Sequence, residues 1–246
     1  MNSSIRRELY SLRLALVSSI ILTVLCSTGM SPAFGMRSIC LNASSSAVYS
    51  SSAEKNSLKN STGVITLNKN RYNKARKLQF FNEDGSLWYE FSFYDDDADN
   101  SLDEAKKEFQ PFSFHRDYFV LALKCVGKDA NRFQVVVNES TRLTKFIGRR
   151  DASFKFQTWE EHILDLFAVG FDSSNNPLRI RPGDYVRTLP LPSDEVTFQP
   201  LQIKGNWLKV RWKVSGDSKG KNNKLRYGWV KWKQNSELVV ELFYIS

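Results

Sequence analysis

The chain has 246 residues, which is enough for one large or two small domains. Hydrophobic residues make up 41% of it and charged residues 25%, and these fractions exclude bulk disorder. With 35 Lys and Arg against 26 Asp and Glu, the formal net charge is +9. This excess favours anionic partners, but it does not indicate a fold.

The first 35 residues have the composition of an export signal. Three arginines, at positions 6, 7 and 13, precede the apolar run 14–25. That run is shorter than the roughly 20 residues that a membrane span needs. Small residues at Ala33 and Gly35, or at Ser27 and Gly29, fit a signal-peptidase site. We expect residues 1–35 to be a signal peptide, cleaved after Gly35 or Gly29, and the protein to be periplasmic or extracellular, with no membrane span after signal removal.

Two alternatives for this segment stay open, an uncleaved anchor and a lipoprotein. A lipoprotein would be modified at Cys26, but the preceding residue, Leu25, is at a position that normally holds a small residue.

In an oxidising compartment, Cys40 and Cys125 could pair. The sequence favours instead a buried thiol at Cys125, which lies in an apolar strand pattern.

Residues 36–62 are rich in Ser and Asn and have no hydrophobic period, which predicts a flexible linker. A β-rich domain of unknown function is expected over residues 63–175. It begins with a strand at 63–67, and Asp84-Gly85 marks the turn of a hairpin. The second arm of this hairpin, 87–94, is apolar on both faces and is expected to be central in a sandwich or packed against another layer. Further strands are expected within 112–126, 132–138 and 141–149.

A single helix is expected after Thr158. Thr158 and Glu161 have the spacing of a capping box. Trp159, Ile163, Leu166 and Phe167 then form one apolar stripe, and Gly170 is the expected end of the helix.

The region 176–246 carries the one family resemblance in the chain. Its motifs are "PLRIRPG" near the start, "NWLKVRW" in the middle and Gly228-Trp229-Val230 toward the end. In this order they resemble the bacterial Src-homology-three-like domain. The resemblance implies a small β-barrel that serves as an accessory binding module in exported bacterial proteins. The chain departs from the family in its long loop after Val214 and in an additional strand after Trp232.

The net positive charge of the expected mature chain lies in this C-terminal region. Residues 36–175 have 19 basic and 19 acidic side chains, whereas residues 176–246 have 13 basic and six acidic ones. Strand alternation predicts a core face made by Leu208, Val210, Trp212 and Val214, together with Val230 and Trp232. The opposite face is the candidate ligand-binding surface, composed of Trp207, Trp229, Lys209, Arg211, Lys213, Lys231 and Lys233. Indole rings beside cations suit sugars, acidic peptides or phosphates. The plainer interpretation is that the tryptophans cover a barrel end and that the lysines protect an edge strand from aggregation.

Catalytic and metal-binding patterns are not evident in the sequence. The chain contains neither a nucleophile-elbow nor a zinc-protease motif, and Cys125 lacks the Asp-Cys-Ser setting of cell-wall cysteine endopeptidases. The two histidines, His115 and His162, are expected to be solvent-facing or half-buried. An acidic stretch offers calcium-type spacing at Asp97, Asp99, Ser101, Asp103 and Glu108, but Leu102 stands where such a loop needs Gly.

These patterns together predict a mostly β protein, with an antiparallel β-sandwich-like domain and one short helix, followed by a small Src-homology-three-like β-barrel. The expected function is non-catalytic binding in the cell envelope or outside the cell, with no cofactor and no metal. The expected ligand is a cell-wall glycopeptide or another anionic envelope polymer. The expected partner is thus a cell-wall or envelope polymer or an envelope protein, and no nucleic acid is expected. The alternative is a structural or protein–protein interaction protein whose Trp-rich face is buried between domains. A hydrolase with a degenerate site is a third possibility.

Overall fold

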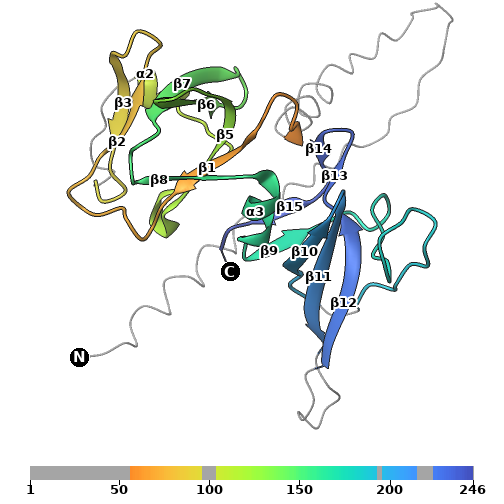
Figure 1. Ribbon diagram of the computed structural model, residues 1–246. Coiled ribbons are helices and arrows are strands. Elements are labelled where there is room, and N and C mark those ends of the chain that lie inside the picture. Colours follow the sequence, from red (N-terminus) through yellow and green to blue (C-terminus); the bar gives the residue numbers. More distant parts are fainter. Residues whose placement is uncertain (1–55, 96–103, 193–195, 215–223, 246) are drawn as a thin grey trace, which may run out of the picture. The chain divides into compact units, whose positions relative to one another are not determined.

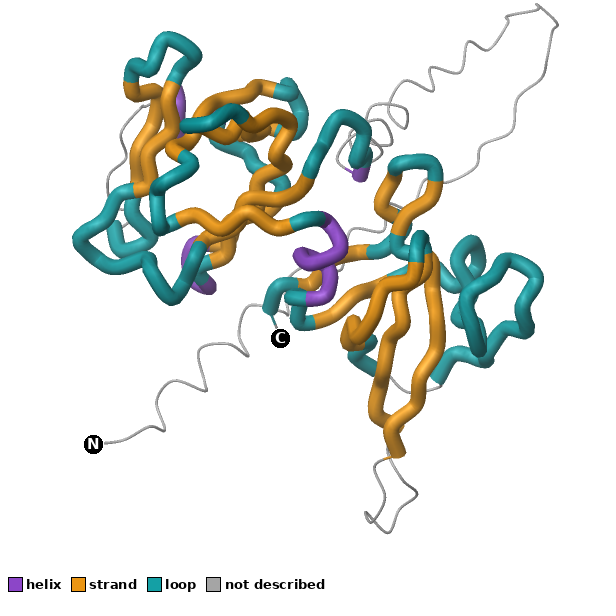
Figure 2. The backbone as a smooth tube through the Cα atoms, viewed as in Figure 1, coloured by secondary structure: helices purple, strands orange, loops and turns teal. Residues whose placement is uncertain are grey.

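The computed structural model describes residues 56–95, 104–192, 196–214 and 224–245. Its named strands pair antiparallel, and Figure 2 shows that helices are short segments between them. The elements in Figure 1 are, in chain order, β1 (Gly63–Leu67), β2 (Leu78–Phe81), β3 (Leu87–Phe91), α2 (Glu104–Glu108), β4 (Ser113–His115), η1 (Arg116–Tyr118), β5 (Val120–Lys128), β6 (Arg132–Asn138), β7 (Leu143–Gly148), β8 (Phe154–Gln157), α3 (Trp159–Leu164), β9 (Ala168–Gly170), β10 (Gln199–Lys204), β11 (Trp207–Val214), β12 (Lys224–Lys231), β13 (Lys233–Gln234), β14 (Glu237–Leu238) and β15 (Glu241–Phe243). The mostly β, antiparallel, sandwich-like fold class is therefore confirmed. The predicted signal peptide lies outside the described residues.

The N-terminal strands form one eight-stranded sheet in the order β3-β2-β7-β6-β5-β1-β8, with β4 paired to β5. This sheet curls around its own core. In a flat sheet β2 and β8 would lie about 24 Å apart, because five steps of roughly 4.8 Å separate them. Instead, the rings of Phe80 in β2 and Phe154 in β8 are 6.0 Å apart. Both rings belong to one buried cluster.

Of the two expectations for residues 87–94, the central position is wrong, because β3 lies at an edge of this sheet. The hairpin itself is present, and Gly85 has the positive φ (86°) that its turn requires. The second apolar face of the arm is covered by other means. Tyr94 contacts the rings of Tyr72 and Phe119, and the ammonium of Lys145 lies over the ring of Trp88.

β1 and β5 separate two buried clusters. In β1, Ile65 faces the cluster inside the curled sheet, whereas its neighbour Val64 belongs to the second cluster. In β5, Leu123 and Ala122 are divided in the same way. Both strands are therefore apolar on successive residues, as is usual for strands buried on both faces.

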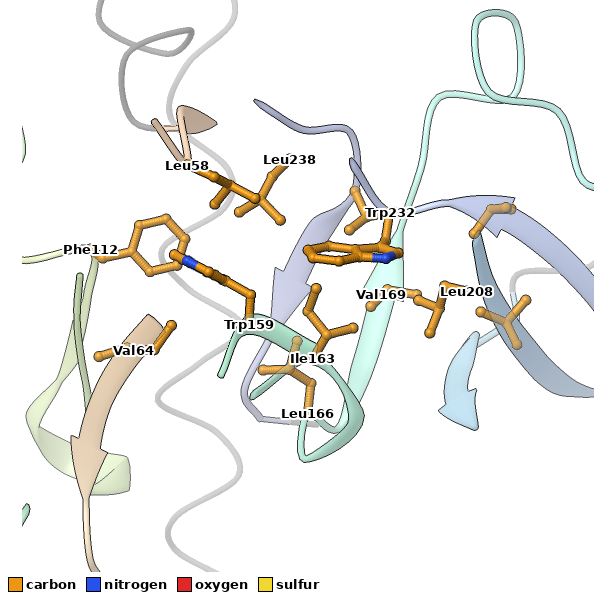
Figure 3. Close-up of a cluster of buried hydrophobic side chains, with 14 of the residues drawn as sticks. Leu58, Val64, Phe112, Trp159, Ile163, Leu166, Val169, Leu208, Trp232 and Leu238 are labelled. Carbon is orange, nitrogen blue, oxygen red and sulfur yellow. The ribbon is translucent and has the colours of Figure 1, made fainter. Parts of the chain in front are cut away.

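The second cluster is shared between the first sheet, α3 and the C-terminal strands. Figure 3 shows Ile163 next to the ring of Trp232 and Leu58 next to Leu238, and Trp159 and Leu166 belong to the same cluster. β9 pairs with β15, so the predicted domain boundary at 175/176 is crossed by a strand pair. Chain contacts accordingly group the described residues into one compact unit.

Of the predicted linker 36–62, residues 36–55 lie outside the described residues, and the described end is attached to the fold. The Leu58 side chain is buried in the second cluster, and its N–H donates to the carbonyl of Ser236 at 2.7 Å. Ser57 bridges to Glu237. The Ser- and Asn-rich composition did not predict this attachment, because Leu58 is the one buried residue between positions 56 and 62.

The capping box is confirmed. The Thr158 hydroxyl accepts from the Glu161 N–H, and the Glu161 carboxylate accepts from the Thr158 N–H. The helix ends at Leu164 rather than at Gly170, which lies in β9. Phe167 consequently leaves the apolar stripe and is 40% exposed.

The C-terminal region forms a three-stranded sheet, β10-β11-β12, and the two-stranded pairs β13-β14 and β15-β9. The closed barrel that the family resemblance implies stays a prediction. Within the described residues, no helix has the length and apolarity to cross a membrane.

Candidate functional site

The strands predicted to carry the basic face are paired as expected. β11 and β12 align antiparallel, with Trp207 opposite Lys231 and Lys209 opposite Trp229. On the core side Leu208, Val210 and Val230 are fully buried. The other side of the same strands is therefore turned away from the core, as the alternation predicts.

We call this outward side the basic face. On β11 it consists of Trp207, Lys209, Arg211 and Lys213, and on β12 of Leu225, Tyr227, Trp229 and Lys231. Trp207 and Trp229 are half-buried and lie outside both core clusters, whereas Arg211 and Lys213 are exposed. Four alternate residues of a strand span about 20 Å, so the basic face is a stripe rather than a pocket.

Lys233 does not belong to the basic face. Its ammonium lies 4.5 Å from the centroid of the buried Trp232 ring, and it approaches Glu160 at 3.5 Å. The alternation of side chains between the two faces of the strand is interrupted between β12 and β13. Lys233 therefore lies next to α3 rather than on the basic face. Lys233 is thus removed from the predicted set.

The structure adds Arg179 to the basic face. Arg179 forms an isolated bridge with Trp229, in which each N–H donates to the carbonyl of the other residue at 2.8 Å. Its guanidinium lies 5.7 Å from the centroid of the Trp207 ring. Arg179 belongs to the motif "PLRIRPG", which is part of the family resemblance of residues 176–246. Its contact with Trp229 joins residues 50 positions apart, and no local sequence pattern predicts it.

Aromatic rings and cations alternate on the basic face. The ammonium of Lys231 lies 5.6 Å from the Trp207 centroid, and that of Lys209 lies 5.4 Å from the Tyr227 centroid. Distances below about 6 Å permit cation–π attraction. Tyr227 could have been predicted, because it precedes Trp229 by two residues in the same strand.

One acidic side chain enters this surface. Asp184 Oδ1 lies 2.5 Å from Lys231 Nζ, and the Asp184 side chain is 57% exposed. Arg211 donates to the Gln199 side chain at 2.9 Å. All other charged side chains named on this surface are basic.

A cleft of about 330 Å³ lies elsewhere, between β1, β8, α3 and Tyr244. His162 lines it but is only 2% exposed, which corrects the expectation of a solvent-facing or half-buried side chain. Its Nε2 is 3.0 Å from the Tyr244 hydroxyl, and its Nδ1 is 3.5 Å from Gln157 Oε1. Burial lowers the pKa of His162 to about 4, Asp165 opposes this shift and Lys155 adds to it. A neutral imidazole held on both nitrogens serves here as a packed polar residue.

Within the described part of the chain, the remaining candidates show no reactive arrangement. Cys125 is fully buried, as predicted, and burial raises the pKa of its thiol, which disfavours the reactive thiolate. His115 is exposed at the end of β4. Of the calcium-type positions, Asp97, Asp99, Ser101 and Asp103 lie outside the described residues, and Glu108 is exposed at the end of α2.

Comparison of the chain with family models, with curated proteins and with solved structures finds no match. The resemblance of residues 176–246 to the Src-homology-three-like domain therefore stays a prediction.

Proposed function

We propose that this chain is an exported, non-catalytic binding protein that acts in the cell envelope or outside the cell. Its ligand, a cell-wall glycopeptide or another anionic envelope polymer, lies on the basic face. The observation that carries this proposal is the placement of two half-buried indoles among cations on the side of the β11–β12 pair that faces away from the core.

The rigid setting of these strands supports a binding role. The core sides of β11 and β12 are anchored by Leu208, Val210 and Val230, which are fully buried. Side chains on the opposite side are therefore presented from a fixed backbone. Binding costs less conformational entropy when the contacting groups are already in place.

The alternative, an interaction protein with these tryptophans buried between domains, is less well supported. The tryptophans in the shared core are Trp159, Trp212 and Trp232. Trp207 and Trp229 lie outside both buried clusters. Iodide quenching of the Trp207→Phe and Trp229→Phe variants measures this difference, because loss of an accessible indole reduces the quenched fraction.

Retention of the purified chain on isolated cell wall tests the proposed function. The double variant Trp229→Ala, Lys231→Ala should lose retention while its melting temperature stays near that of the parent chain. Lys77→Ala is the matched control, because it removes an exposed lysine that pairs with Glu90 on β3. Equal retention of the double variant and the parent chain would remove the basic face as the binding site.

Export is tested separately by the intact mass of the protein recovered from native cells. A mature chain that begins at Met36 or Met30 in the envelope fraction or the medium supports export. A full-length chain in the cytoplasm contradicts it.

A further inference from the structure

Building on the proposed function, we propose that the ligand is a linear polymer with repeating phosphate or carboxylate groups rather than a neutral glycan, and that Asp184 competes with it for Lys231. The chemistry of the basic face carries this choice, because its rings contact the protein's own cations.

The ring of Trp207 is already engaged by two cations. Arg179 and Lys231 lie 5.7 and 5.6 Å from its centroid. A sugar binds tryptophan by stacking on an open ring face, and cations over the ring take that place. The Trp207 ring thus holds the Arg179 guanidinium and the Lys231 ammonium close together. Positively charged donors of this kind form their strongest hydrogen bonds with anionic oxygens.

Arg179 is held from three directions. One of its guanidinium nitrogens donates to the Val186 carbonyl at 2.8 Å, its backbone is bridged to Trp229, and its guanidinium lies over Trp207. A fixed guanidinium loses little entropy when it binds an anion, and its planar donors match phosphate and carboxylate geometry. This is the feature of the basic face that is most specific for an anionic ligand.

A second ring repeats the arrangement farther along the strands. Lys209 lies over Tyr227, which is 48% exposed. Arg211 and Lys213 follow on β11 at alternate positions, about 7 Å apart. Cations repeated in one line fit a polymer whose charges also repeat, whereas a single small anion would use only one of them.

Asp184 occupies the position of a ligand anion. Its carboxylate is paired with Lys231, at the same end of the stripe as Arg179. The Lys231 side chain is 23% exposed, but that of Asp184 is 57% exposed. An ion pair open to solvent on its acidic side contributes little to stability, so an incoming polymer can displace the carboxylate. Removal of the Asp184 charge should therefore strengthen binding of an anionic ligand and leave a neutral ligand unaffected.

The experiment measures the affinity of the purified chain for three probes. They are long-chain polyphosphate, poly-γ-glutamate and a neutral N-acetylglucosamine oligomer. We expect binding to one or both polyanions, with an affinity that falls as salt rises. Tighter binding of polyphosphate or of poly-γ-glutamate identifies which anionic group the polymer carries.

Four variants resolve the roles of the individual groups. Asp184→Asn should tighten polyanion binding by about threefold, in keeping with loss of a competing ion pair whose carboxylate is open to solvent. Arg179→Gln should weaken it by about tenfold, as expected for one charge-assisted hydrogen bond. Trp207→Phe, which keeps a ring under the cations, should bind better than Trp207→Leu. Circular dichroism confirms that each variant is folded, and Arg211→Gln replaces Arg179→Gln if the latter is not.

Several results would overturn the inference without removing the proposed function. Tight binding of the neutral oligomer that is lost in Trp229→Ala shows a sugar-stacking platform. Weaker polyanion binding by Asp184→Asn shows that Asp184 is no competitor. Tighter binding of single-stranded DNA than of polyphosphate with equal charge shows a nucleic-acid surface. Wall retention that depends on the basic face, with no binding to either polyanion, overturns only the ligand class, whereas retention unaffected by Trp229→Ala, Lys231→Ala overturns the proposed function itself.

Discussion

The Cα atom of Gly228 lies against the side chain of Leu178, which is only 1% exposed. A Cβ atom at Gly228 would stand 2.6 Å from Leu178 Cδ1 and 2.8 Å from its Cγ. Non-bonded carbon atoms do not approach each other so closely. This contact joins the segment that carries Arg179 to the core side of β12, and so it helps to place Arg179 on the basic face.

Gly228→Ala should therefore destabilise the fold by about 1–3 kcal/mol, the usual cost of overpacking a core. Urea unfolding measures this change. Gly148→Ala is the matched control in β7, because its nearest neighbour would be the Asp151 Cβ at 4.0 Å. The double variant Gly228→Ala, Leu178→Ala should lose less stability than the sum of the losses in the two single variants. Full additivity would contradict a direct clash.

The stability of the protein should decrease as the pH falls from about 6.5 to about 4. His162 has its pKa lowered to about 4 in the folded chain, chiefly by burial, while an unfolded histidine titrates near 6.5. In this window the unfolded chain binds a proton that the folded chain does not, so acid favours unfolding. A shift of this size corresponds to about 3 kcal/mol.

Unfolding curves at several pH values test this prediction with His162→Gln and His115→Gln. The first variant should lose the slope between pH 6.5 and 4 that the histidine contributes. The second removes an exposed histidine and should keep that slope. Equal slopes in the parent chain and in His162→Gln would show that His162 is not the responsible group.

A buried ion pair stabilises the junction of β5 with the segment after β6. Lys124 Nζ lies 2.7 Å from Glu139 Oε2, with side-chain exposures of 1% and 7%. The ammonium also lies over the Phe112 ring, and Arg142 approaches the same carboxylate at 3.6 Å. Removal of one member leaves an uncompensated buried charge, which typically costs about 3–5 kcal/mol.

Glu139→Gln should cost more than Lys124→Met, because Arg142 can still compensate Glu139 when Lys124 is absent. The double variant Lys124→Met, Glu139→Leu should recover much of the lost stability. Thermal unfolding ranks the three variants. Lys77→Met, at the exposed pair with Glu90, is the control and should have a much smaller effect. The reverse ranking of the two single variants would contradict the role given to Arg142.

The capping box of α3 should contribute measurably to stability, because this helix lies in the shared core. Thr158→Ala removes the oxygen that accepts from the Glu161 N–H at 3.2 Å, and about 1 kcal/mol of stability should be lost. Thr158→Ser keeps an acceptor at the same position and should retain most of it. Equal stability of the Ala and Ser variants would show that the cap is replaced by solvent.

Local patterns in the sequence were sufficient for much of the fold. The Asp84-Gly85 turn, the capping box at Thr158 and the alternation of β11 each depend on residues close together in the chain. That β11 pairs with β12 was also predictable, since two adjacent strands joined by one loop form a hairpin, whereas the register that sets Trp207 opposite Lys231 came from the structure. The sequence by itself thus determined which side chains share the outward face of β11 and β12.

Only the tertiary structure decided what surrounds those elements. Arg179 reaches Trp207 through a bridge to Trp229, His162 is covered by Tyr244, and Leu58 is attached by Ser236. Each contact joins segments at least 28 residues apart, and nothing in the local pattern of either segment encodes its partner. Such positions depend on how two apolar cores on opposite sides of β1 and β5 pack together, which is a property of the whole chain.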